Sequence, residues 1–191
     1  MSVNIMITGV GGQGTLLASR LFGAVTMANG LDVKVSEVHG MSQRGGSVVT
    51  YVKYGDAVHS PVIDRGEADY ILAFERLEAA RHLAYLKPGG TMIVNDQRIT
   101  PMPVITGAMR YPEDIIEKMK DASDCDIIAL DALALATEAG DARSVNVVLL
   151  GVISKLLEFP ESDWISALER IVRPQFVDMN KRAFALGQAQ L

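Results

Sequence analysis

The feature that most constrains the fold of this chain is a glycine-rich turn close to its start. Residues 3–8 (VNIMIT) have the composition of a short buried strand, and Gly9, Gly11, Gly12 and Gly14 follow directly. A long apolar segment, typical of a helix, comes next. Strand, glycine loop and helix in this order open a dinucleotide-binding βαβ unit. The pattern predicts an α/β fold: a Rossmann-like open, largely parallel sheet flanked by helices, with C-terminal helices closing one side.

Three glycines of this first loop have different expected roles. Gly9 permits the tight turn, Gly11 leaves space where a phosphate would approach, and Gly14 lets helix and strand pack closely. The following helix N-terminus presents unpaired N–H groups and a positive dipole end, which favour an anion. An acid near the end of the second strand, Glu37, could accept from a ribose hydroxyl. Glycines that serve only close packing or a subunit contact would produce the same pattern.

A second glycine-rich loop, HGMSQRGG over residues 39–46, follows a second expected strand at residues 33–38. Paired glycines beside an arginine can form a backbone nest with a guanidinium above it. The loop should lie at the C-terminal edge of the sheet with the first loop, where open α/β sheets bind ligands. A glycine turn with a solvated arginine is the alternative. The candidate residues of both loops are Gly9, Gly11, Gly12, Gln13, Gly14, His39, Ser42, Gln43, Arg44, Gly45 and Gly46.

The rest of the chain alternates strand and helix patterns, without repeats or low-complexity segments. Residues 57–60 are expected to pair in a short hairpin, and residues 104–106 to form an edge strand within a proline-rich connector. We expect strands over residues 47–54, 68–74, 91–95 and 126–130. We expect helices over residues 14–28, 75–86, 112–120, 132–139, 145–157, 162–172 and 175–186, with Ser162 and Asp163 capping the helix of Trp164.

Two expected helices, residues 15–28 and 145–157, contain a single charged residue each. A surface helix should show a polar face at a spacing of 3.6 residues, and these barely do. Each is therefore either a central helix packed on the sheet or a helix that also faces another subunit. Asn146, a polar residue in the second of them, is expected to be a satisfied core or interface group.

Composition excludes several classes of function. The net charge is −5, and no run of Lys or Arg suggests nucleic-acid binding. A single cysteine, Cys125, excludes a disulfide framework and an iron–sulfur cluster held by this chain alone. The three histidines lack metal-ligand spacing. The uncharged, largely apolar run at residues 144–154 is shorter than the roughly 20 residues that span a bilayer. We expect a soluble, cytoplasmic protein without a metal site.

The two loops also carry a family resemblance. VGGQG at residues 10–14 and EVHGMSQRGGSV at residues 37–48 resemble the gamma-type subunits and domains of the 2-oxoacid:ferredoxin oxidoreductases. The sequence is most similar to the small (beta) subunits of the indolepyruvate:ferredoxin oxidoreductases within this family. The resemblance runs from the first strand to the C-terminal helices, and HGMSQRGG is its most specific part. It implies one gamma-type domain over residues 1–191, with a helical part from about residue 144.

The resemblance also implies a division of labour between subunits. The complete enzyme would oxidatively decarboxylate an aryl 2-oxoacid such as indolepyruvate, use coenzyme A, and reduce ferredoxin. Thiamine diphosphate, Mg²⁺ and 4Fe-4S clusters would reside in a large partner subunit, and this chain would supply no catalytic residue. Consistently, Gly55-Asp56 and Gly140-Asp141 are each followed by alanine and do not form the GDG motif that holds magnesium diphosphate.

The role of the two loops is left open by the sequence. They could border the partner's active site, contact a coenzyme A phosphate, or dock the subunits. Two other classes of function remain: a stand-alone NAD(P)-dependent Rossmann oxidoreductase, and a non-enzymatic dimeric binding module. A homodimer is compatible with each of these interpretations.

Overall fold

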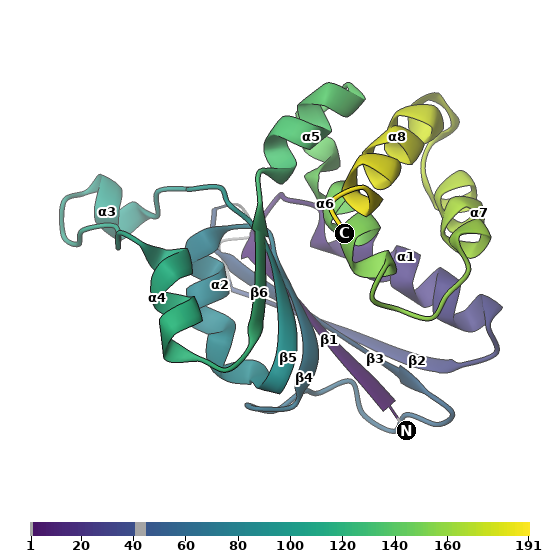
Figure 1. Ribbon diagram of the computed structural model, residues 1–191, viewed down its shortest axis with the longest axis horizontal. Coiled ribbons are helices and arrows are strands. Elements are labelled where there is room, and N and C mark those ends of the chain that lie inside the picture. Colours follow the sequence, from purple (N-terminus) through teal and green to yellow (C-terminus); the bar gives the residue numbers. More distant parts are fainter. Residues whose placement is uncertain (1, 41–44) are drawn as a thin grey trace.

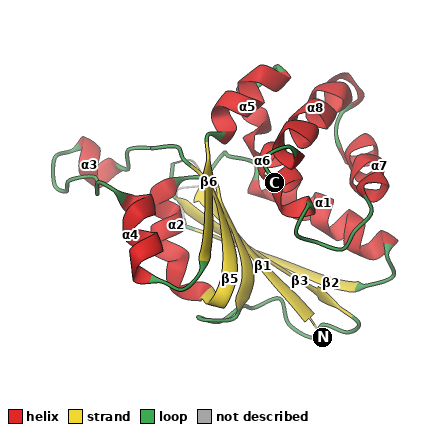
Figure 2. Cartoon of the chain, in the orientation of Figure 1, coloured by secondary structure: helices red, strands yellow, loops and turns green. Residues whose placement is uncertain are grey.

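The computed structural model describes residues 2–40 and 45–191, which form a six-stranded sheet with helices on both faces (Figures 1 and 2). The strand order is β2-β3-β1-β4-β5-β6, and β3 alone runs against the others. The predicted open, largely parallel α/β sheet is therefore confirmed. The strands are β1 (Ser2–Val10), β2 (Asp32–His39), β3 (Ser47–Gly55), β4 (Ala68–Ala73), β5 (Leu86–Asn95) and β6 (Asp126–Leu130).

The helices divide between the two faces of the sheet. Figure 1 shows α2 and α4 on one face, and α1 with the C-terminal helices α6, α7 and α8 on the other. The helices are α1 (Thr15–Ala28), α2 (Arg76–His82), α3 (Met102–Ile105), α4 (Ile115–Ala122), α5 (Ala132–Ala139), α6 (Val145–Ser154), α7 (Glu161–Ile171) and α8 (Val177–Gln188), with short 3₁₀ turns at Leu83–Tyr85, Ala142–Ser144 and Pro174–Phe176.

Several predicted elements are wrong, each for a local reason. Residues 57–60 form no strand, because β3 already pairs with β1 and β2 on its two sides. Residues 102–105 form the helix α3 after Pro101, not an edge strand. Ser162 and Asp163 do not cap α7, which begins after Pro160 without a side-chain cap.

The strand β5 begins earlier than expected and runs through Pro88 and two glycines. Leu86 pairs with Ala68 of β4, whereas Thr91 pairs with Tyr70. This shift of register absorbs the extra residues of β5 as a bulge, which accommodates a proline within a strand. The helix expected over residues 75–86 is correspondingly shorter and ends at His82.

The helix α6 is the centre of the core on the C-terminal side. All ten of its residues are buried, and α8 covers it. A Cβ at Gly151 would lie 2.1 Å from the carbonyl oxygen of Phe184, and one at Gly187 would lie 2.0 Å from that of Val148. The two backbones thus meet through glycine. The core interpretation of the helix expected over residues 145–157 is confirmed. Among the described residues, no helix is long and apolar enough to cross a membrane.

The topology places a crevice between β1 and β4. These strands are parallel neighbours, but the chain leaves β1 toward α1 on one face and leaves β4 toward α2 on the other. In open α/β sheets, ligands bind beyond the carboxyl ends of the strands at such a switch point. The first glycine loop lies at this position.

Candidate functional site

The glycine loop after β1 combines unusual backbone angles with close contacts. Gly12 and Gly14 have φ values of 104° and 87°, in the left-handed region that favours glycine. A Cβ at Gly9 would lie 2.8 Å from Oε1 of Gln13 and 3.0 Å from Cβ of Phe74. Close approach therefore requires glycine at residue 9, and backbone conformation favours it at residues 12 and 14.

Gln13 braces the loop across the crevice. Its Oε1 accepts a hydrogen bond from the backbone N–H of Val10 at 2.7 Å. Its Nε2 donates to the carbonyl oxygen of Phe74, directly after β4, at 3.0 Å. The side chain thus ties the end of β1 to the end of β4, so its amide serves to hold the loop in shape.

The two predicted loops lie together, as expected. Gly11 donates its backbone N–H to the carbonyl oxygen of Gly46 at 2.8 Å, and Gly45 donates to the carbonyl oxygen of Gly11 at 3.4 Å. Among the other candidates, His39 is exposed at the end of β2. Ser42, Gln43 and Arg44 lie outside the described residues. The shared edge of the two loops is confirmed for the residues that the structure describes.

The N-terminus of α1 offers unpaired hydrogen-bond donors at this edge. Gly14 precedes the helix without a side-chain cap. Within the described part of the chain, the backbone N–H groups of Gly12, Gly14, Thr15 and Leu16 donate no hydrogen bond. Unpaired N–H groups combined with the positive end of a helix dipole attract an anion. The geometry therefore favours a phosphate or carboxylate here.

Glu37 does not take the position of a ribose acceptor. In a dinucleotide fold the second strand adjoins the first, and its terminal acid lies beside the glycine loop. Here β3 is inserted between β1 and β2, and Glu37 pairs with Thr50 of β3. Two strand spacings of about 4.8 Å separate Glu37 from β1. The side chain is exposed, and the usual dinucleotide contact is not formed.

Two buried carboxylates support the crevice from α2. Glu75 is 1% exposed, and its oxygens accept from the backbone N–H groups of Leu77, Glu78 and Ile99. The hydroxyl of Tyr111 also donates to Glu75, at 2.5 Å. Burial, followed by this bond to a carboxylate, raises the pKa of Tyr111. Glu75 therefore ties the start of α2 to the segment that follows β5.

The second carboxylate, Glu78, binds the residue that follows the second loop. It is 5% exposed and accepts from Oγ of Ser47, the first residue of β3, at 2.5 Å. Arg81 forms an ion pair with its other oxygen at 3.2 Å. Glu75 and Glu78 were not among the functional residues predicted from the sequence. The available signal was one acid at the N-cap and a second in the first turn of a helix that follows a buried strand.

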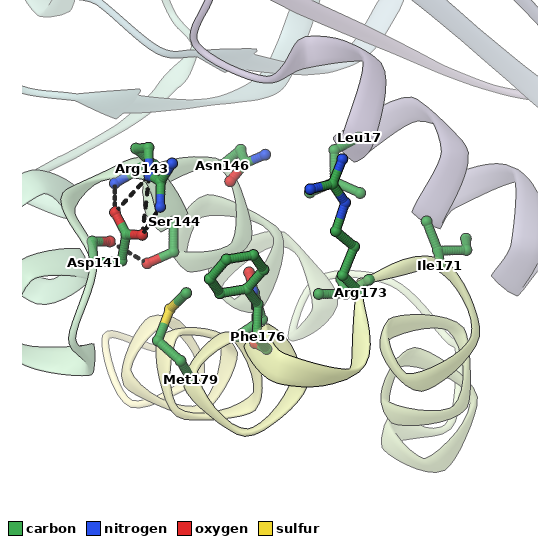
Figure 3. Close-up of a pocket in the computed structure, with 11 residues that line it drawn as sticks. Leu17, Asp141, Arg143, Ser144, Asn146, Ile171, Arg173, Phe176 and Met179 are labelled. Carbon is green, nitrogen blue, oxygen red and sulfur yellow. Dashed lines mark hydrogen bonds and ion pairs between the residues drawn. The ribbon is translucent and has the colours of Figure 1, made fainter.

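A cavity of about 320 Å³ lies beside the glycine loop, between α1, α6 and α8 (Figure 3). Asn146 of α6 connects the cavity to the glycine loop, because its Nδ2 donates to the carbonyl oxygen of Gly14 at 3.1 Å. The prediction that Asn146 is a satisfied buried group is confirmed. The cavity is lined by Leu17, Asp141, Arg143, Ser144, Asn146, Ile171, Val172, Arg173, Phe176, Met179 and Asn180.

The two arginines of this cavity differ in their partners. The Arg143 side chain binds Asp141 through both carboxylate oxygens, at 2.6 and 3.0 Å. These hydrogen bonds lower the pKa of Asp141 to about 2. Arg173 has no acidic partner among the described residues, and in Figure 3 its guanidinium extends toward Leu17 of α1.

Known proteins and a family pattern match this chain over nearly its whole length. The pattern of the family described as "Pyruvate ferredoxin/flavodoxin oxidoreductase" matches residues 4–190. "Indolepyruvate oxidoreductase subunit IorB" of Pyrococcus horikoshii is 44% identical over 188 residues, covering 96% of this chain and 93% of its own. A protein of the same description from Thermococcus kodakarensis is 45% identical over 190 residues, with the same coverage.

Among solved structures, a keto/oxoacid ferredoxin oxidoreductase gamma subunit from Geobacter sulfurreducens has a similar fold. It matches with a TM-score of 0.74 at 23% identity, over 98% of this chain and 97% of its own. At this identity the likeness concerns the fold alone. It shows that the arrangement of strands and helices described above also occurs in a protein of that description.

Proposed function

The chain belongs to the pyruvate ferredoxin/flavodoxin oxidoreductase family, and from this premise we propose that it is the small subunit of an indolepyruvate:ferredoxin oxidoreductase. One observation carries the proposal: the identity of about 45% with subunits of that description extends over nearly the full length of both chains. The complete enzyme would convert an aryl 2-oxoacid and coenzyme A to an acyl-CoA and carbon dioxide, and pass two electrons to ferredoxin. Residues 1–191 would act as one gamma-type domain.

The donor atoms of this chain do not fit the cofactors of such an enzyme. An iron–sulfur cluster is held mainly by several cysteine thiolates, and the chain has one cysteine. Among the described residues, no three His, Cys, Asp or Glu side chains are placed to hold a metal ion. We therefore assign thiamine diphosphate, Mg²⁺ and the iron–sulfur clusters to a large partner subunit. No catalytic residue is assigned to this chain.

The crevice at the glycine loop supports a role in binding coenzyme A. Four backbone N–H groups of the loop have no hydrogen-bond partner among residues 2–40 and 45–191. With the dipole of α1 they match a phosphate, and coenzyme A carries several phosphates. Gly12 and Gly14 present no side chain that would keep a phosphate away from these donors. The loop residues would close the coenzyme A pocket of the large subunit, with ferredoxin contacting the assembled complex.

The alternative of a stand-alone NAD(P)-dependent enzyme is less well supported. The inserted strand β3 separates Glu37 from the glycine loop, so the ribose of a dinucleotide lacks its usual acceptor. Gln13, which occupies the switch point, is engaged by Val10 and Phe74. The geometry therefore retains an anion site and lacks the second contact that selects a dinucleotide.

Anaerobic purification of the tagged chain from its native host tests the proposal. We expect a large subunit with a thiamine diphosphate motif and cysteine clusters to co-purify, and the complex to reduce a viologen dye when indolepyruvate and coenzyme A are added. The matched control omits either substrate. Recovery of the chain alone with a bound nucleotide would instead support a stand-alone Rossmann enzyme.

A further inference from the structure

We propose that the cavity between α1, α6 and α8 is a binding site for a small monocarboxylate with an aromatic body. This cavity adjoins the glycine loop through Asn146, and its proposed ligand does not depend on the proposed function. Its volume of about 320 Å³ lies near the lower end of the range for small-molecule sites, about 300–1,000 Å³. The ligand is therefore small.

The lining of the cavity favours an aromatic body. Five of its side chains are apolar and come from α1, the end of α7, the connection between α7 and α8, and the first turn of α8. The ring of Phe176 can stack against or meet the edge of a ligand ring, and the thioether of Met179 favours contact with an aromatic edge. The apolar members are Leu17, Ile171, Val172, Phe176 and Met179.

The charges of the cavity favour one anionic group. Arg143 is neutralised by Asp141, which it binds through two oxygens. Arg173 has no acidic partner among the described residues, so the cavity has one uncompensated guanidinium. A guanidinium pairs with the two oxygens of a carboxylate through parallel hydrogen bonds. A phosphate dianion would leave a negative charge uncompensated here, whereas a monocarboxylate would not.

The backbone around Arg173 is already arranged for this role. Arg173 precedes the 3₁₀ turn Pro174–Phe176, and its carbonyl oxygen accepts from the N–H of Phe176 at 2.9 Å. Asn180 of α8 donates its Nδ2 to the carbonyl oxygen of Phe176 at 2.8 Å. These bonds fix the turn that carries both the cation and the aromatic ring, which reduces the ordering cost of binding.

An NMR titration of the full chain, labelled at the methionine methyl groups, tests the site. The probes are 3-phenylpropanoate, its neutral analogue 3-phenylpropan-1-ol, inorganic phosphate and coenzyme A. We expect 3-phenylpropanoate to shift the Met179 methyl signal, assigned with Met179→Leu, in a saturable manner. The alcohol should bind about tenfold more weakly or worse, because the bond to a charged group is lost.

Two variants decide the role of the cation. Arg173→Gln should weaken binding of 3-phenylpropanoate about tenfold, whereas Arg170→Gln, an exposed arginine of α7 outside the cavity, should leave it unchanged. Both residues are exposed, so folding should be unaffected. Equal affinity of Arg173→Gln and the unaltered chain would overturn the proposal. So would a Met179 signal that responds to phosphate or coenzyme A but not to 3-phenylpropanoate, because the cavity would then be part of a phosphate-ligand site.

Discussion

At the scale of single residues, Gly14 shows how one position serves both the loop and the core. Its φ of 87° lies in the left-handed region, and a Cβ would lie 2.5 Å from Nδ2 of Asn146. Asn146 is 3% exposed and bonded to the Gly14 carbonyl oxygen, so it has little freedom to move away. Backbone strain and a steric clash therefore act against any side chain at residue 14.

We predict that Gly14→Ala lowers the free energy of unfolding by about 2–4 kcal/mol, from strain and overpacking together. Gly12→Ala is the matched control: its φ is also positive, but no atom of the described residues, its chain neighbours aside, lies within 4 Å of a Cβ there. It should lower the free energy by only about 1 kcal/mol. Urea denaturation measures both, and equal losses would contradict the role assigned to Asn146.

The Asp141–Arg143 pair predicts a dependence of stability on pH. The hydrogen bonds of Arg143 lower the pKa of Asp141 to about 2 in the folded chain. A carboxyl group with a lowered folded-state pKa contributes stability above its unfolded pKa of about 4, and this contribution disappears as the pH falls through the folded value.

In Arg143→Gln, we expect the pKa of Asp141 to return toward its ordinary value, and the loss of stability between about pH 4 and pH 2 to become smaller. NMR detection of the Asp141 side chain during an acid titration measures the first effect, and acid denaturation measures the second. The prediction fails if the titration of Asp141 is the same in both proteins.

At the scale of elements, the backbones of α6 and α8 approach each other closely at Gly151 and Gly187. A Cβ at Gly151 would lie 2.1 Å from the carbonyl oxygen of Phe184, which cannot rotate away. Gly151→Ala should therefore lower the free energy of unfolding by about 3 kcal/mol or more. The control is Gly23→Ala in α1, where nothing lies within 4 Å.

Alanine at Gly23 should stabilise the protein by about 0.4–1 kcal/mol, because alanine favours the helix. Thermal unfolding followed by circular dichroism compares the two variants. An unchanged melting temperature for Gly151→Ala would show that α6 and α8 can separate without loss of stability, against the packing described above.

A hydrogen bond between α2 and the start of β3 fixes the end of the second loop. Ser47→Ala removes the donor to the buried carboxylate of Glu78 and should lower the free energy of unfolding by about 1.5–3 kcal/mol. Ser162→Ala, whose exposed hydroxyl has only a 3.4 Å contact with Asp163, should change it by less than about 0.5 kcal/mol. Denaturant titration distinguishes them, and a neutral Ser47→Ala would refute the anchoring role of Glu78.

At the scale of the whole molecule, the topology predicts what the isolated chain does not bind. Because β3 lies between β1 and β2, Glu37 cannot complete a dinucleotide site at the glycine loop. We expect isothermal titration of the full chain with NADH or NADPH to give no binding heat up to millimolar concentrations. The same chain should show no 2-oxoacid-dependent dye reduction until the large subunit is added. Binding heat with either nucleotide would contradict the first expectation, and dye reduction by the isolated chain would contradict the second.

The fold class and the joint position of the two loops could be predicted from local patterns. The run VNIMIT before four closely spaced glycines specifies a strand, a turn and a helix, because only glycine adopts the backbone angles seen at residues 12 and 14 without strain. Most strands and long helices were likewise predictable, since hydrophobic periodicity and glycine or proline stops are properties of neighbouring residues. The family resemblance was contained in the two glycine-rich segments, residues 10–14 and 37–48.

The tertiary structure alone decided strand order and the partners of the buried polar groups. No local pattern shows that β3 enters between β1 and β2, because strand pairing depends on distant segments. For the same reason the sequence did not indicate that Glu78 meets Ser47, or that Asn146 meets Gly14, 132 residues away. The amino-acid sequence determined the elements and the glycine loop, whereas the packing of remote segments determined the crevice, the hydrogen bonds that support it and the cavity beside it.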